Sequence, residues 1–163
     1  YLMLGGGLLI IILLLWMVFG GKSTPGQEDM QKVVQNTSDA VGILDDYQEN
    51  VAFSGTKNDL ALSRIILRGN YQNLNTLYVK TYKPKKSFAA NPKPDKESKK
   101  TLDEAKRDNR LDSELVTVLK AKVASAYSSL LQAKKNFKSK KSLETLNKAQ
   151  EDLKSVSEIL NDQ

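Results

Sequence analysis

The sequence opens with an uninterrupted apolar run from Leu2 to Phe19 that contains no charged residue and no proline. As an α-helix rising about 1.5 Å per residue, this run is about 27 Å long, close to the hydrocarbon thickness of a bilayer. Aromatic rings at its C-terminal end favour the headgroup region. We therefore expect a single transmembrane helix over residues 1–21, and Leu2, Leu9, Trp16 and Phe19 mark the span.

The alternative interpretation of this run is a cleavable secretory signal, with Gly20 or Ser23 as the small residue at the cleavage site. A signal normally begins with Met and a basic segment, whereas this sequence begins with Tyr1. The basic residues that follow the run, Lys22 and Lys32, are too few to fix its orientation. We expect an anchored protein whose folded body is extracytoplasmic.

The amino-acid composition removes most catalytic chemistry. The 163 residues include no cysteine and no histidine, which excludes disulfides, thiolate or imidazole metal sites, and histidine-based catalysis. The acidic clusters fall mostly off the apolar stripes, where they are typical of solvated helix faces. We expect a non-enzymatic protein with no metal and no cofactor.

Beyond a flexible neck at 22–26, apolar residues recur at three- and four-residue spacing, which is typical of amphipathic helices. The pattern predicts helices over residues 27–53, 57–82, 101–138 and 142–161. Their apolar stripes include Met30, Val33, Ala40 and Leu44 in the first, Leu60, Leu67, Tyr71 and Leu74 in the second, Leu115, Leu119, Val123 and Leu130 in the third, and Leu146, Leu153, Val156 and Leu160 in the fourth.

Local capping signals set the expected helix starts. Thr56 caps the second helix, the sequence from Thr101 to Glu104 forms a capping box for the third, and Ser142 caps the fourth. The third helix has a second candidate start, because Asp112 or Ser113 follows a strongly polar stretch and also offers a cap.

Two helical hairpins joined by a linker over residues 83–100 therefore form the domain at 27–163. Neither hairpin buries its apolar stripe alone, so we expect them to pack as an antiparallel four-helix bundle in an all-α fold. The alternative is two extended hairpins that pair with other copies. If the first helix rises from the membrane, the linker and the C-terminus return towards it, and the turns at Gly55 and near Lys140 are distal.

The linker carries most of the net charge of +6. Its lysines that we predict to contact anionic lipid or a partner are Lys83, Lys85, Lys86, Lys93, Lys96, Lys99 and Lys100. A polybasic loop beside a bilayer attracts anionic headgroups. The alternative is a solvated linker whose lysines keep it extended and soluble. Nucleic acid is disfavoured as a partner, because the segment does not array basic and aromatic residues on one face.

Gly42 and Gly69 lie at nearly equal distances from the turn at Gly55, so the hairpin brings them to the same height. Outward-facing glycines at one height predict a notch where a partner helix docks. The alternative is coincidence, because glycine inside a helix costs only about 1 kcal/mol.

These features predict a single-pass, membrane-anchored helical bundle that acts as a structural or interaction subunit of a membrane or cell-envelope assembly. Only in architecture, such a chain resembles anchored subunits of envelope assemblies and extracytoplasmic sensing bundles of receptors. A ligand-sensing bundle is the runner-up, disfavoured because no second apolar run leads back through the membrane. A soluble exported binding protein is the third alternative, and nothing in the sequence specifies a small-molecule ligand.

Overall fold

The computed structural model describes residues 24–85 and 87–162, and every regular element in them is helical. In chain order the elements are α2 (Gln27–Tyr47), a 3₁₀ turn η1 (Gln48–Asn50), α3 (Ser54–Tyr82), α4 (Lys96–Arg107), α5 (Leu111–Lys134) and α6 (Lys140–Asn161). The all-α prediction is confirmed. The expected transmembrane helix at 1–21 lies outside these residues, and within them no helix has the length and hydropathy needed to span a membrane.

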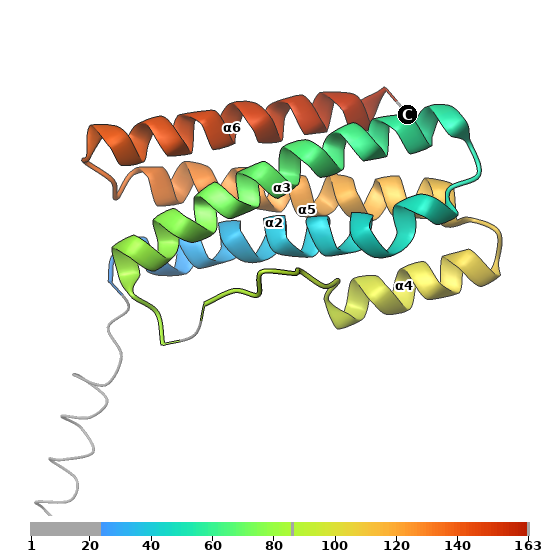
Figure 1. Cartoon of the computed structure of the whole chain (residues 1–163), viewed down its shortest axis with the longest axis horizontal. Helices are drawn as coiled ribbons and strands as arrows, with labels where there is room; N and C mark the ends of the chain where they lie inside the picture. The colour runs from blue at the N-terminus through green and yellow to red at the C-terminus, as the bar shows by residue number, and fades with distance from the viewer. Residues whose placement is uncertain (1–23, 86, 163) are drawn as a thin grey trace, which may run out of the picture.

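Four long helices, α2, α3, α5 and α6, lie side by side along the long axis of the molecule (Figure 1). Around the bundle their order is α2, α3, α6, α5, and each contacts the two neighbours in that order. Neighbouring helices run in opposite directions, and α4 lies outside the four-helix layer (Figure 1). The prediction of a helical bundle is confirmed.

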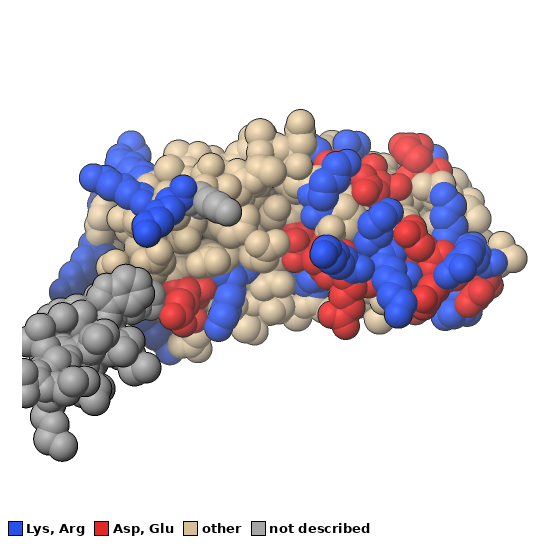
Figure 2. Space-filling model, turned by 90° about the horizontal axis from the view of Figure 1, so that it is seen from below, with Lys and Arg blue, Asp and Glu red and all other residues tan. Residues whose placement is uncertain are grey.

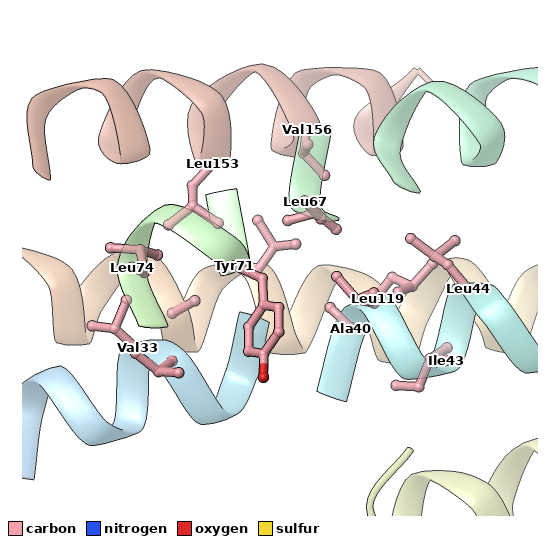
Figure 3. Packing of buried hydrophobic residues seen from close by; sticks show 14 of the residues in the cluster. Val33, Ala40, Ile43, Leu44, Leu67, Tyr71, Leu74, Leu119, Leu153 and Val156 are labelled. Atoms are coloured by element: carbon pink, nitrogen blue, oxygen red, sulfur yellow. The ribbon is translucent and has the colours of Figure 1, made fainter. Parts of the chain in front are cut away.

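The core lies where the inward stripes of the four helices meet (Figure 3). Side chains with no exposed surface come from every long helix and include Val33, Ile43, Leu67, Leu74, Leu119, Leu130, Leu146 and Leu153. Burying a leucine or valine side chain fully contributes about 1.5–3 kcal/mol relative to leaving it exposed. The inward stripes expected from the three- and four-residue spacing therefore hold the bundle together.

The middle of helix α2 is enclosed on all sides. Residues 37–44 are all buried, because the linker and α4 lie over the side of α2 that faces away from the core. Pro92 in the linker is buried, and the hydroxyl of Tyr71 donates a hydrogen bond to the carbonyl of Ala89. The segment expected to be a linker therefore contacts the bundle, although most of its side chains remain exposed.

The expected third helix, residues 101–138, is two helices. Asp95 caps the first, α4, because its carboxylate accepts hydrogen bonds from the backbone N–H groups of Glu97 and Ser98, each at 3.1 Å. Thr101 lies inside α4, so the expected capping box is not the helix start. Just after α4, Asn109 has the left-handed conformation with φ of 55°, and the N–H of Arg110 donates to the carbonyl of Ala105 at 2.8 Å.

Other helix boundaries also differ from the expected ones. α2 ends at Tyr47 rather than 53, because η1 follows and the backbone of Val51 is extended. The carboxylate of Asp112 then accepts hydrogen bonds from the N–H groups of Ala52 and Phe53. α6 begins at Lys140, so Ser139 occupies the cap position that we expected for Ser142.

The second hairpin points in the direction opposite to the expected one. α2 begins at what we call the near end, where α3 and α5 finish and α6 begins; α2 and α6 finish at the far end (Figure 1). A Cβ at Gly26 would lie 2.7 Å from Asn136, which places the α5–α6 turn beside the start of α2. The linker and α4 run the length of α2, so α5 starts at the far end. The turn near Lys140 is therefore not distal, and the C-terminal helix ends far from the start of α2.

Candidate interaction surfaces

Lysines gather at the near end of the bundle. We call Lys80, Lys83, Lys85, Lys135, Lys138, Lys140 and Lys141 the near-end lysines; they come from the end of α3, the residues just after it, and the α5–α6 turn with the start of α6, and all are exposed. Figure 2 shows basic side chains collected at this end beside a small acidic patch, whereas the other half mixes many basic with many acidic side chains. Among the described residues, no ion pair involves a near-end lysine.

Aromatic rings hold the two lysine-bearing segments together. The ring of Tyr82, at the end of α3, meets Phe137 of the α5–α6 turn edge-on, with centroids 6.2 Å apart. Tyr78 lies 5.6 Å from Tyr82 and 5.8 Å from Phe88 of the linker. Edge-to-face and tilted aromatic pairs at these distances are favourable beyond the area that they bury. The segments that carry the near-end lysines are therefore held in place by packed aromatic side chains.

The structure does not keep the predicted lysine set together. Lys83 and Lys85 belong to the near end, and Lys86 lies outside the described residues. The ammonium of Lys93 lies 3.3 Å from the carboxylate of Asp46, beside α2. The other members, Lys96, Lys99 and Lys100, lie on the exposed side of α4, where Lys99 also pairs with Asp103 at 3.4 Å.

Sequence reasoning missed the second half of the near-end cluster. The chain carries no acidic residue between Glu114 and Glu144, while five lysines lie between 134 and 141. That local excess was a usable signal, but the turn was expected at the other end of the bundle. Only the direction of the second hairpin brings residues 135–141 beside residues 80–85.

The two glycines expected to form one notch have different surroundings. A Cβ on Gly42 would lie 2.4 Å from the carbonyl carbon of Lys93 and 2.6 Å from the nitrogen of Pro94, so the linker backbone occupies this position. Gly69 is exposed, and a Cβ there would have nothing within 4 Å. The backbone of the linker therefore occupies the space beside Gly42, whereas the space beside Gly69 is open.

The outer face of α3 is uncharged over most of its length. Opposite its buried stripe, alternating four- and three-residue steps connect Asn58, Leu62, Ile65, Gly69, Gln72, Thr76 and Val79, which we call the α3 outer stripe; all are exposed. Ile65 is 71% exposed and Leu62 is 48% exposed. This spacing is that of a coiled-coil seam, in which one helix packs against another.

A buried ionic cluster fastens α4 to the bundle. The ammonium of Lys122 on α5 lies 3.2 Å from Asp39 of α2 and 2.8 Å from Asp95, the cap of α4. Burial raises the pKa of Asp39, although Gln35 and Lys122 oppose the shift. Burial would also raise the pKa of Asp95, but hydrogen bonds from Lys122 and Ser98 outweigh it and hold that pKa at about 2. A single ammonium group bridges carboxylates from two other helical segments, so the cluster is suited to holding helices together.

Metal binding finds no support in the part of the chain that the structure describes, where no three acidic side chains gather into a cation site. The near-end lysines and the α3 outer stripe are two exposed surfaces that are suited to recognition. No family model, no curated protein and no solved structure matches this chain.

Proposed function

We propose that this chain is a non-enzymatic, single-pass membrane protein whose helical bundle serves as a structural or interaction subunit of a membrane or cell-envelope assembly. The apolar run from Leu2 to Phe19 supplies the anchor, and the bundle lies on the extracytoplasmic side. The observation that carries the interaction role is the α3 outer stripe. In this proposal the stripe is the face that the anchored bundle offers to another helix.

A comparison with α6 supports this assignment. The outer face of α6 follows the same four-and-three spacing through Glu144, Lys148, Glu151, Ser155 and Glu158, and four of these five residues are charged. A solvated helix face normally looks like that of α6, because charged groups keep their hydration there. The α3 outer stripe lacks charge and exposes Leu62 and Ile65, which favours contact with another protein over solvation.

Substitutions on the two faces test the interaction role. We expect the full chain, purified in a mild detergent, to have a mass above that of one copy, either as a self-assembly or with a subunit retained from its native membrane. Ile65→Lys should reduce the mass to that of one copy, because the stripe would then carry a charge that is desolvated on contact. Ser155→Lys adds the same charge to the outer face of α6 and should leave the mass unchanged. A wild-type protein that is purified in mild detergent as a single copy, with neither a second copy nor a retained subunit, would contradict the role.

Membrane anchoring has its own test. The full chain should stay in the membrane fraction after alkaline washing, because an inserted apolar helix resists removal of peripheral contacts. Replacing Leu9 and Leu13 with Arg should release the chain, since each arginine at the centre of a span costs about 2.5–3.5 kcal/mol on insertion scales. Release of the wild-type chain by the same wash would contradict an inserted anchor.

A further inference from the structure

Two lysine-bearing segments that are far apart in the sequence share the near end. Residues 80–85 close α3, and residues 135–141 join α5 to α6. The contact between Tyr82 and Phe137, with ring centroids 6.2 Å apart, holds these segments beside each other. The resulting surface combines the lysines of both segments and exists only when the bundle is folded.

The basic groups of the near-end surface are all lysines, whereas the arginines lie elsewhere, and Glu28 and Asp29 in the first turn of α2 also lie at this end. Arg64 and Arg68 both pair with Asp45 on α2, and Arg110 pairs with Asp108 and Glu114. Lysine ammonium groups are flexible point charges, and they lack the planar fork with which arginine grips one carboxylate or phosphate. Such a surface suits a fluid plane of anionic groups better than a partner of fixed shape.

The position of the near end restricts what it meets. Residue 24 lies at this end, and the apolar run ends at Phe19. Even a fully extended chain spans only about 17 Å between these two residues. Attraction between charges is effective over about 8–10 Å at physiological ionic strength. The tether therefore holds the start of α2, and with it the near end, no more than about 17 Å from the end of the apolar run, which is about two screening lengths at full extension and less for any shorter tether.

We propose that the near-end lysines dock the bundle onto the anionic headgroups of the bilayer that holds its anchor. This inference rests on the proposed membrane anchoring and adds the chemistry of the surface that the bundle meets. Docking through one end orients the long axis of the bundle away from the bilayer. The α3 outer stripe, which runs along that axis, then lies along the side of the bundle, where it is open to neighbouring subunits.

Single-cysteine labels report this docking directly, because the chain has no cysteine of its own. Ser139→Cys places a dye at the near end, where Ser139 makes no capping hydrogen bond with its side chain. Ser54→Cys places the same dye at the far end, on an exposed residue. The full chain is inserted into lipid nanodiscs of phosphatidylcholine alone, or with about one third phosphatidylglycerol, and quenching by a headgroup-attached quencher is measured.

We expect the dye at Ser139 to be quenched more in anionic than in neutral discs, and 0.5 M salt to remove the difference. The dye at Ser54 should respond to neither change. Replacing Lys135, Lys138, Lys140 and Lys141 with Gln should lower the ratio of docked to undocked bundle at least tenfold, since each lysine near an anionic surface contributes about a fivefold factor. The matched control replaces Lys96, Lys99, Lys100 and Lys106 with Gln, which removes the same charge from α4, and should retain docking.

The outcomes separate docking from anchoring. A chain that fails to enter either disc overturns the anchor and, with it, this inference. A chain that enters both discs, but whose dye at Ser139 is quenched equally in both, overturns the docking and leaves the anchor standing. Equal loss of quenching in the two four-lysine variants also overturns it, because net charge rather than the near-end surface would then be responsible. Lipid-independent binding of a soluble polyanion, such as a single-stranded oligonucleotide, at the near end would assign the surface to another partner and overturn it as well.

Discussion

Helices α2 and α3 form one hairpin and carry similar inward stripes, yet α2 is enclosed on all sides over residues 37–44 and α3 keeps an open outer face. The difference comes from the segment between α3 and α5. This segment returns along α2, seats its backbone against Gly42 and places α4 against α5 and α2, whereas the outer face of α3 receives no such cover in the described residues. Enclosure should make α2 the helix most sensitive to substitution, while the outer face of α3 should tolerate substitutions and can present a surface.

The largest loss of stability should follow removal of the lysine from the ionic cluster that holds α4 against α2 and α5. Lys122→Met leaves Asp39, which is 4% exposed, without its cation, so we expect the free energy of unfolding to fall by about 3 kcal/mol. Urea unfolding of the full chain in a mild detergent, followed by circular dichroism, measures this change.

Lys120→Met provides the matched control, because the ion pairs of the described chain do not include Lys120. Adding Asp39→Asn to Lys122→Met should recover part of the loss by removing the unpaired charge. If the two single lysine substitutions cost the same, the cluster does not stabilise the enclosure of α2.

The next largest effect should come from filling the contact at Gly42. In Gly42→Ala the new methyl group overlaps the backbone of Lys93 and Pro94, which cannot move aside as a flexible side chain would. Overpacking of this kind costs about 1–3 kcal/mol. Urea unfolding should show a lower midpoint, and limited proteolysis should cut the linker faster than in the wild type. An unchanged midpoint with an unchanged linker would mean that the linker does not depend on this contact.

A smaller, pH-dependent effect is expected at the cap of α4. The folded pKa of Asp95, about 2, lies below the ordinary value of 3.8, so its charge stabilises the fold above pH 4, and this contribution disappears as the pH falls towards 2. Asp95→Asn keeps a capping side chain but loses the charge. We expect it to be less stable than the wild type by about 1 kcal/mol at pH 7, with the difference vanishing near pH 2. A difference that persists at low pH would show that geometry rather than charge makes Asp95 stabilising.

The smallest effect should be a gain in stability on the open side. Gly69→Ala adds a methyl group where nothing lies within 4 Å, so only the helix propensity changes. We expect a stabilisation of up to about 1 kcal/mol, opposite in sign to the effect of Gly42→Ala. Equal signs for the two substitutions, measured by the same urea titration, would contradict the contrast between the enclosed and the open helix.

Helical spacing in the sequence predicted the inward side of every long helix. Residues such as Leu44, Leu74, Leu119 and Leu153 repeat every three or four positions, and burial of their stripes requires a bundle. This inference depends only on the spacing of apolar residues within each helix, which can be read directly from the sequence. The helix starts were less well predicted, because Asp95 and Thr101 both offer caps, and only packing against Lys122 distinguishes them.

Neither the near-end surface nor the cover of α2 was predictable from composition. Proline and lysine between 83 and 100 predict a linker that is free of the bundle, but its backbone packs where Gly42 has no side chain. Glycine inside a helix was a signal of close approach, although it did not show that the same chain approaches. The direction of the second hairpin depends on this packing, and the union of residues 80–85 with residues 135–141 follows from that direction.

The route of the chain around α2 also has a consequence for folding kinetics. Asp39 and Lys122 are separated by 83 residues, and the contact between Asn70 and the carbonyl of Ala149 spans 79. The contacts within each hairpin are far more local, and contacts between distant residues form more slowly because their loops must close first. We therefore expect the two hairpins to form early and to associate in a slower step. Until they associate, α2, the most completely buried helix of the native bundle, is half exposed to water.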